Sequence, residues 1–416
     1  MIATNGSVMD FPSTREEAWR YTPVDEIVSR LDAATIATVP TAKCVSRPIV
    51  DALAGEHGGP RLVFVNGVYV AALSDDDDLP SGLWCGIADL SHGRAAANVA
   101  LACIDHAVDG FLARNHADGC DGAVVVVDPG VRVEVPIHVV YISAPVDGRQ
   151  IGDSATVSHP RTIIDVGDDS HIALIQTYCG FDEFAVTNAS TTIRVGRRAD
   201  VDHCRVQTES TSATHLGHTR IEQEAGSRLR MTSVTIGSDI ARNAIGVHLN
   251  GPDAQCQLLG VNVTTGRQRH DTVVTVDHAA SRCASTQRFT GVVDDHGRGS
   301  FSGEIIVRPG TVGTDAQQTN RNLILSPDAE SDTRPWLQIL ADDVRCTHGA
   351  TVGRLDDEAL FYLRSRGIPL DAGRQMLVGA FIRDITDAIQ HASLRKHVAA
   401  LISSSRATAT VVTEEL

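Results

Sequence analysis

A cysteine and a histidine two residues apart, Cys346 and His348, are the side chains best suited to bind a metal ion. If Val344 to His348 form a β-strand, alternation places Val344, Cys346 and His348 on one face. A thiolate and an imidazole on the same face can both reach one metal, and iron sites accept such ligands. The structural alternative is a partly buried histidine beside a cysteine that packs as a small hydrophobic residue.

The other histidines and paired acids are better explained by the fold than by metal chemistry. His203 and Cys204 are neighbours, so a strand would point them to opposite faces. His215 and His218 lie three residues apart and would bind a metal only adventitiously. We expect structural roles, in turns or hydrogen-bonded ladders, for the remaining residues of this kind that lie close together: His270, Asp271, Asp277, His278, Asp294 and Asp295.

The nine cysteines form no disulfide or metal-binding motif. They are scattered, odd in number and never spaced as C-x-x-C: Cys44, Cys85, Cys103, Cys120, Cys179, Cys204, Cys256, Cys283 and Cys346. This pattern gives little support to a disulfide scaffold, a zinc ribbon or a self-contained ferredoxin-type site. Reduced thiols in a cytosolic protein fit the pattern better.

The composition narrows the class of protein. Only 4% of the 416 residues are aromatic, so the core must be mainly aliphatic. The formal net charge of −16 argues against a nucleic-acid binder, which needs a basic face. The first residues lack the basic and apolar runs of a signal peptide, and no stretch of about 18 apolar residues occurs. We therefore expect a cytoplasmic protein that binds neither nucleic acid nor membranes.

Short β-type runs with similar separators fill residues 119–345. Anchoring on Asp169, Ala199, Gly226, Ala254 and Ala280 gives steps of 30, 27, 28 and 26 residues. A loose repeat of this length is typical of a solenoid, in which each coil shares its core with the next. Because no helical period lies between the runs, the sequence predicts a β-helix. A large β-sandwich is the alternative, although its turns should recur every 8–12 residues.

Mixed and helical segments flank this core. Residues 1–118 form the expected N-terminal region, with a hairpin at 62–70 around Asn66-Gly67 and a helix at 94–116. Residues 346–416 form the expected C-terminal region. A helix at 356–367 opens with acids, closes with arginines and is followed by Gly367. Asp371 is expected to cap a second helix, and residues 392–403 form a third.

Several segments resemble the SufB/SufD family of iron–sulfur cluster assembly proteins. The N-terminal segment 17–22 reads EAWRYT, and the C-terminal segment 341–353 reads ADDVRCTHGATVG and leads into LFYLRSRGI at 360–368. Between them, GRQRHDT at 266–272, VDH at 276–278 and TDAQQTNRNL at 314–323 also fit the family. The resemblance covers most of residues 160–390 and is weaker in the N-terminal third.

Details of the motifs resemble the SufD branch more than SufB. SufB carries a cysteine near the position of Asn320, and this chain does not. SufB is acidic on both sides of the histidine, where Thr347 and Gly349 stand here. Both departures weaken any claim that this chain alone holds a cluster.

The resemblance implies a fold, partners and a cargo. It implies a right-handed parallel β-helix with N-terminal and C-terminal helical segments, acting as a non-catalytic scaffold subunit. The β-helix should pair with a SufB-type paralogue, with His348 as a ligand or proton handler at the interface and Cys346 as a second candidate. An iron–sulfur cluster should be transient and shared with that partner, with none bound by this chain alone. Alone, the chain could form a homodimer.

The resemblance also implies that the C-terminal helices dock a SufC-type ATPase. The sequence has no G-x-x-x-x-G-K-[ST] motif, so ATP hydrolysis is expected in that separate subunit. The candidate docking residues are Leu360, Phe361, Tyr362, Arg364, Arg366, Met376 and Phe381. Simple capping of the solenoid by these helices is the alternative role.

Two other functions remain open from the sequence. A β-helix polysaccharide lyase or hydrolase would need clustered carboxylates or a basic proton acceptor in a cleft, and usually a secretion signal. A structural homodimer could pair the edges of its coils without metal chemistry, because unpaired edges favour such pairing.

Overall fold

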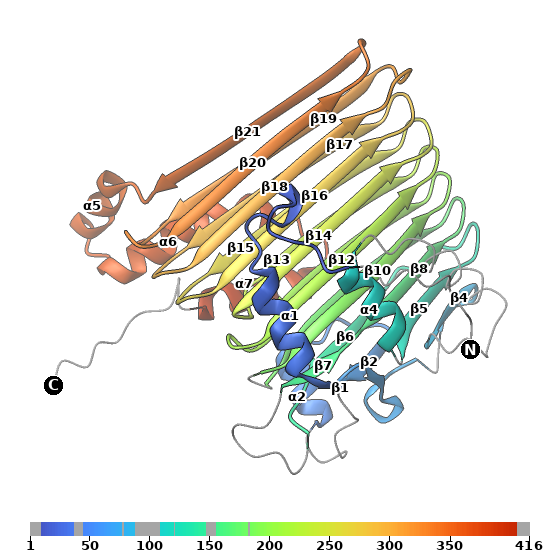
Figure 1. Cartoon of the computed structure of the whole chain (residues 1–416), viewed down its shortest axis with the longest axis horizontal. Coiled ribbons are helices and arrows are strands. Elements are labelled where there is room, and N and C mark those ends of the chain that lie inside the picture. The colour runs from blue at the N-terminus through green and yellow to red at the C-terminus, as the bar shows by residue number, and fades with distance from the viewer. Residues whose placement is uncertain are drawn as a thin grey trace.

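The body of the molecule consists of two β-sheets that the chain visits in turn (Figure 1). The computed structural model describes residues 10–36, 45–76, 79–87, 109–119, 121–146, 155–181 and 184–405. The first sheet contains β1 (Thr35–Ile36), β4 (Leu83–Ile87), β5 (Gly122–Val127), β7 (Thr156–Ser158), β8 (Arg161–Val166), β10 (Val186–Val195), β12 (Thr214–Gln223), β14 (Ile240–Leu249), β16 (Arg269–His278), β18 (Arg298–Val307) and β20 (Glu330–Ile339). The second sheet contains β2 (Arg61–Val65), β3 (Val68–Tyr69), β6 (Ile137–Ser143), β9 (His171–Gly180), β11 (Asp200–Thr208), β13 (Arg228–Thr235), β15 (Gln255–Thr264), β17 (Ala284–Val293), β19 (Thr314–Ile324) and β21 (Val344–Arg354).

Neighbouring strands are parallel in both sheets, except for the antiparallel pairs β2–β3 and β4–β5. From β8 onward the chain alternates between the sheets, so each strand up to β19 pairs with the strand two positions later in sequence. This winding is a β-helix, in which stacked coils share one core. The predicted β-helix with flanking helices is confirmed, and the alternative of a large β-sandwich is wrong. Regular pairing extends on both sides of the expected core range of 119–345, and the division into three regions stays a prediction.

The separators that define the sequence repeat are turns between the sheets. One residue of each such turn has a positive φ: Asp169, Arg198, Gly226, Asp253 and Arg282. Side chains in this series form ladders, because Arg198 donates to Asp169 and Arg282 donates to Asp253, with nitrogen–oxygen distances of 2.5–2.8 Å. These exposed ladders add little stability, and the turn conformation explains the repeat.

The N-terminal hairpin and part of the expected helix are present. Asn66 and Gly67 have φ values of 52° and 81°, as a type I′ turn requires, and join β2 to β3. The helix expected at 94–116 is described only from its last part, α4 (Gly110–Asp118), because residues 88–108 lie outside the described chain. Asp109 caps α4 by accepting from the backbone N–H of Leu112 at 2.9 Å.

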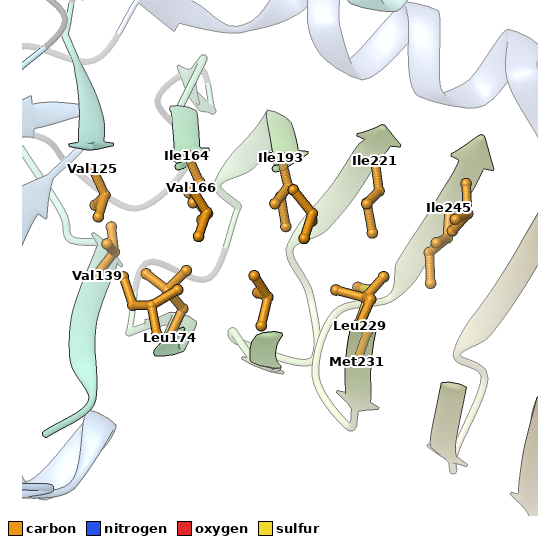
Figure 2. Close-up of a cluster of buried hydrophobic side chains, with 14 of the residues drawn as sticks. Val125, Val139, Ile164, Val166, Leu174, Ile193, Ile221, Leu229, Met231 and Ile245 are labelled. Carbon is orange, nitrogen blue, oxygen red and sulfur yellow. The ribbon is translucent and has the colours of Figure 1, made fainter. Parts of the chain in front are cut away.

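Aliphatic side chains fill the space between the sheets, as Figure 2 shows for a part of the core. These side chains alternate along each strand with residues that point outward. The labelled residues are Val125, Val139, Ile164, Val166, Leu174, Ile193, Ile221, Leu229, Met231 and Ile245. The core is therefore mainly aliphatic, as the low aromatic content predicts.

Helices cover part of each outer face. Helices α1 (Val24–Ala33) and α4 contribute to a cluster on the first sheet, with Ile27 and Phe111 buried against Leu216 and Ile240. Helix α2 (Arg47–Ala54) covers the start of the second sheet. Farther along, α6 (Leu370–Thr386) and α7 (Ala392–Ser404) lie on the same sheet. Among the described helices, none is long and apolar enough to cross a bilayer.

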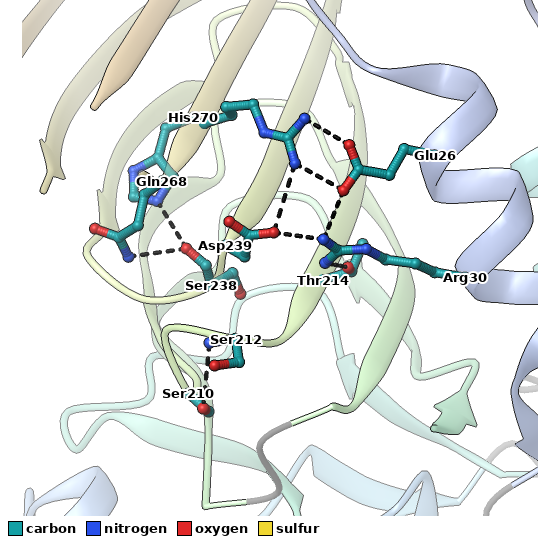
Figure 3. Close-up of polar contacts among 10 residues, drawn as sticks. Glu26, Arg30, Ser210, Ser212, Thr214, Ser238, Asp239, Gln268 and His270 are labelled. Atoms are coloured by element: carbon teal, nitrogen blue, oxygen red, sulfur yellow. Dashed lines mark hydrogen bonds and ion pairs between the residues drawn. The ribbon is translucent and has the colours of Figure 1, made fainter. Parts of the chain in front are cut away.

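Ion pairs and a hydrogen bond attach α1 to the first sheet, at β12, at β16 and at the residue before β14 (Figure 3). Glu26 accepts two hydrogen bonds from Arg269 at 2.6 and 2.8 Å, and one from Arg30 at 2.6 Å. Arg30 also pairs with Asp239 and donates to the Thr214 hydroxyl at 2.9 Å. The hydrogen bond from Arg269 and the nearby positive charges lower the pKa of Glu26, so its carboxylate stays ionised in this network.

The segment 17–22 docks on the outer face of the same sheet. The guanidinium carbon of Arg242 lies 3.6 Å from the ring centroid of Trp19. Arg242 donates to the Thr22 hydroxyl at 2.8 Å and also pairs with Asp271. Thr22 donates to Asp271, and Ser300 donates to the same carboxylate at 2.6 Å. The N-terminal motif is therefore a docking element for the β-helix.

We expect Asp271→Ala to destabilise the chain strongly, because it leaves the Arg242 charge buried without its partner. The side chains of Arg242 and Asp271 are only 5% and 7% exposed. Breaking a buried pair in this way costs about 3–5 kcal/mol of unfolding free energy. Urea denaturation followed by circular dichroism measures the change. Glu134→Ala, in the exposed Arg132–Glu134 pair, is the control and should leave the midpoint nearly unchanged. Equal midpoints for the two variants would contradict the docking role.

Candidate functional site

Cys346 and His348 lie on β21, the last strand of the second sheet. β21 pairs with β19 along one edge, and β20 pairs with β18 in the other sheet. In the described parts of the chain, no strand pairs with the outer edge of either. We call the exposed edges of β20 and β21, with the connecting residues 340–343, the open end of the solenoid.

The strand geometry places Cys346 and His348 on one face of β21. Val344 and Cys346 pack against a small buried cluster formed by Ile305, Val307 and Ala316, at the inner side of the last coil. His348 follows two residues later and is exposed at the open end. The structure thus brings the two residues together as the sequence pattern suggests, and their role as iron ligands stays a prediction.

The thiol of Cys346 is not activated in the isolated chain. Partial burial, with a smaller effect of Asp315, raises the pKa of Cys346. The neutral thiol therefore predominates at neutral pH, and a metal must displace its proton to bind. Among the described residues, no group of three or more His, Cys, Asp or Glu side chains is arranged to hold a metal ion.

Large apolar side chains are exposed at the open end. Trp336, Leu340 and Val352 are 48%, 49% and 46% exposed. The Arg334 guanidinium carbon lies 4.8 Å from the Trp336 ring centroid, and Arg334 also pairs with Glu17 at 2.9 Å. Sequence reasoning missed these residues. They could have been found from the sequence, because apolar residues recur in the last coil although no further coil follows to cover them.

The C-terminal helices pack on the solenoid through one side only. Val378 and Ile382 of α6 and Leu394 and Val398 of α7 are buried against the outer valines of the second sheet. Helix α5 (Asp357–Ser365) begins after Asp356, which caps it by accepting from two backbone N–H groups at 2.9 and 3.2 Å. No residue of α5 is buried. The cap expected from Asp371 is wrong, because α6 begins at Leu370 without a side-chain cap.

The candidate docking residues divide into two groups. Leu360 packs toward Gly373 of α6. Phe381 packs under Arg321 of β19, whose guanidinium carbon lies 4.8 Å from the Phe381 ring centroid. These two residues fix the helices to each other and to the sheet. The side chains of the second group are exposed: Phe361, Tyr362, Arg364, Arg366 and Met376. Phe361, Tyr362 and Met376 are 73%, 57% and 53% exposed.

The remaining histidines and acids lie in hydrogen bonds of the fold. His203 points inward toward Gln176 at 3.2 Å, whereas Cys204 points outward under the C-terminal helices. Other contacts join His270 to Thr264, His278 to Ser285, Arg308 to Asp277 and Ser326 to Asp294. Asp295 has a φ of 55° and accepts from the Gly266 N–H, as expected for a turn.

A buried charged cluster lies inside the solenoid and was not predicted. Arg205 donates to Nε2 of His215 at 2.5 Å, and Nδ1 of His215 lies 2.6 Å from Glu209. Because Nε2 accepts, the imidazole is neutral and its Nδ1–H donates to the carboxylate. Burial lowers the pKa of His215, consistent with this neutral form. His218 faces away on the same strand, so the two histidines do not share a site.

Known proteins are similar to this chain over the solenoid, including the strand that carries Cys346 and His348. A family model described as "SUF system FeS cluster assembly, SufBD core domain" matches residues 149–381. The iron–sulfur cluster assembly protein SufD of Escherichia coli is 31% identical over 94% of this chain and 88% of its own length. A SufBD family protein of Synechocystis is 29% identical over 94% of this chain and 87% of its own length. The chloroplastic protein ABCI7 of Arabidopsis thaliana is 29% identical over 92% of this chain and 80% of its own length.

Proposed function

Because this chain belongs to the SufB/SufD family of iron–sulfur cluster assembly proteins, we propose that it is a non-catalytic scaffold subunit of a SufB–SufC–SufD-type complex. Family membership supports a role in iron–sulfur cluster assembly. The observation that carries the finer proposal is the open end, where two unpaired strand edges, exposed apolar side chains and the Cys346–His348 pair occur together. A polysaccharide-cleaving β-helix enzyme is not favoured by these relatives.

The open end is suited to pairing with a SufB-type paralogue. An unpaired strand edge offers a row of backbone donors and acceptors to a second chain. Trp336, Leu340 and Val352 supply apolar area that such a partner would bury. A second β-helix with a matching open end satisfies both requirements. In the absence of the paralogue, the same surface supports a homodimer.

The cluster is the cargo of this interface. Cys346 and His348 can supply one sulfur and one nitrogen donor from this chain. Iron–sulfur clusters are usually held by four protein ligands, so the remaining donors would come from the partner. A site divided between two subunits fits a cluster that is held transiently and then transferred.

The C-terminal helices are suited to dock a SufC-type ATPase. Exposed aromatic residues and arginines are enriched at the centres of protein interfaces. Phe361, Tyr362 and Arg366 form such a surface on α5, with the Arg366 guanidinium carbon 5.1 Å from the Tyr362 ring centroid. The ATPase then supplies the nucleotide chemistry for which this chain has no phosphate-binding loop. We place the assembly in the cytoplasm of the cell.

Co-expression with the SufB-type and SufC-type proteins tests the proposal. We expect the three chains to purify together and the isolated complex to contain iron and acid-labile sulfide. Purification of the chain with neither partner would overturn the scaffold role. A stable complex that never contains iron or sulfide, even after anaerobic isolation, would overturn the assignment of the cluster as its cargo.

A further inference from the structure

A column of polar side chains leads through the solenoid interior to His348. Strand pairing places Gln287 opposite Gln318, and Gln318 opposite His348. Leu258, the preceding member of the column, belongs to the central core, so this column faces inward. Parallel neighbours of this kind lie about 4.8 Å apart, within reach of one another's side chains.

The side-chain amide of Gln318 uses its nitrogen in a hydrogen bond, whereas its oxygen is available as an acceptor. Gln318 is 2% exposed, and its Nε2 donates to Oε1 of Gln287 at 2.8 Å. Its own Oε1 is buried and accepts no hydrogen bond from any residue that the structure describes. A buried carbonyl oxygen without a hydrogen bond is energetically unfavourable, because it has lost its contact with water. Since the donor end points down the column toward Gln287, Oε1 is the acceptor available to the next residue, His348.

The opposite sheet makes room for this amide. A Cβ added at Gly303 of β18 would lie 2.3 Å from Nε2 of Gln318. The amide therefore occupies a space that exists only because residue 303 has no side chain. This confinement fixes the position of Gln318 next to the open end.

We propose that Gln318 is a positioning residue for His348, its Oε1 accepting the imidazole N–H. Rotation of the exposed His348 side chain onto the coil end forms this hydrogen bond. The bond selects one tautomer and turns the other ring nitrogen, with its lone pair, toward the open end. Metal-binding histidines commonly donate their second N–H to a carbonyl or carboxylate in this way. The inference rests on the proposed function of His348.

Replacing Gln318 by methionine tests the contact, because methionine fills a similar volume without the acceptor. In the chain labelled with ¹⁵N-histidine at pH 8, we expect one dominant His348 tautomer in the wild type and a mixture in Gln318→Met. His348→Ala identifies the resonance. Gln318→Glu restores an acceptor and should restore the single tautomer. Gln317→Met, on the exposed face of β19, is the matched control. Equal tautomer ratios in the wild type and Gln318→Met would overturn the proposal.

The co-expressed complex gives a second readout. Loss of the hydrogen-bond partner that orients a metal-binding side chain lowers metal affinity by about 10–100-fold. Iron content should therefore fall in Gln318→Met and recover in Gln318→Glu, while the complex stays assembled. Unchanged iron in Gln318→Met would contradict a positioning role. The tautomer measurement needs no iron, so it separates failure of this contact from failure of the cluster-binding proposal itself.

Discussion

Replacing Phe361 and Tyr362 together by alanine is expected to abolish stable capture of the SufC-type ATPase while leaving the solenoid folded. Both rings are on α5 and are 73% and 57% exposed, so their removal takes little packing from the chain itself. Truncating a central aromatic residue of an interface commonly costs enough binding free energy to weaken affinity by about 30-fold. Titration calorimetry of the purified chain with the ATPase measures the loss.

Matched variants locate the effect on α5. Lys396→Ala changes an exposed residue of α7 and should leave ATPase affinity unchanged. Phe381→Ala should act mainly by loosening α6 from β19, because Phe381 packs under Arg321. It should therefore lower the unfolding midpoint as well as binding. Wild-type affinity in the Phe361–Tyr362 double variant would refute the docking surface.

Point substitutions test ATPase docking more specifically than removal of the C-terminal helices does. Cutting the chain near residue 350 would remove the end of β21, which runs to Arg354. It would also expose Val206, Val234 and Val261, which α6 and α7 now cover. Loss of ATPase binding in such a fragment would therefore report unfolding as readily as docking.

His348→Ala is expected to lower the iron and sulfide content of the co-expressed complex at least about tenfold, since it removes a ligand outright and even a supporting residue costs that much. His348 is exposed, so the substitution should leave folding and subunit association unchanged. Thr347→Ala is the matched control, because Thr347 is exposed on the opposite face of β21. Wild-type iron and sulfide in His348→Ala would remove this residue from the site.

Features set by local chemistry could be predicted from the sequence. The repeat is visible because each turn needs a residue that tolerates positive φ, such as Asp169, Gly226 or Asp253. The hairpin follows from Asn66-Gly67 alone. The shared face of Cys346 and His348 follows from strand alternation once β21 is assigned.

Features set by distant contacts could not be predicted in this way. Thr22 bonds to Asp271, 249 residues away, and no repeat encodes that pairing. Met376 and Phe381 are five residues apart on one helix, yet one is exposed and the other packs on β19. The apolar side of a helix can be identified from the sequence, but the sequence does not show which of its residues pack on the protein's own sheet. The charged cluster around Glu209 was equally hidden, because its members meet only after the coil closes.

Hydrogen exchange at the open end tests the central claim most directly. Backbone amides of residues 344–354 that point away from β19, to the free edge of β21, should exchange rapidly in the isolated chain at low concentration. Binding of the SufB-type partner should slow their exchange strongly, while amides of β13 and β15 stay protected throughout. Formation of the complex without added protection of β20 or β21 would show that the subunits join elsewhere, and the proposed shared site at Cys346 and His348 would be contradicted.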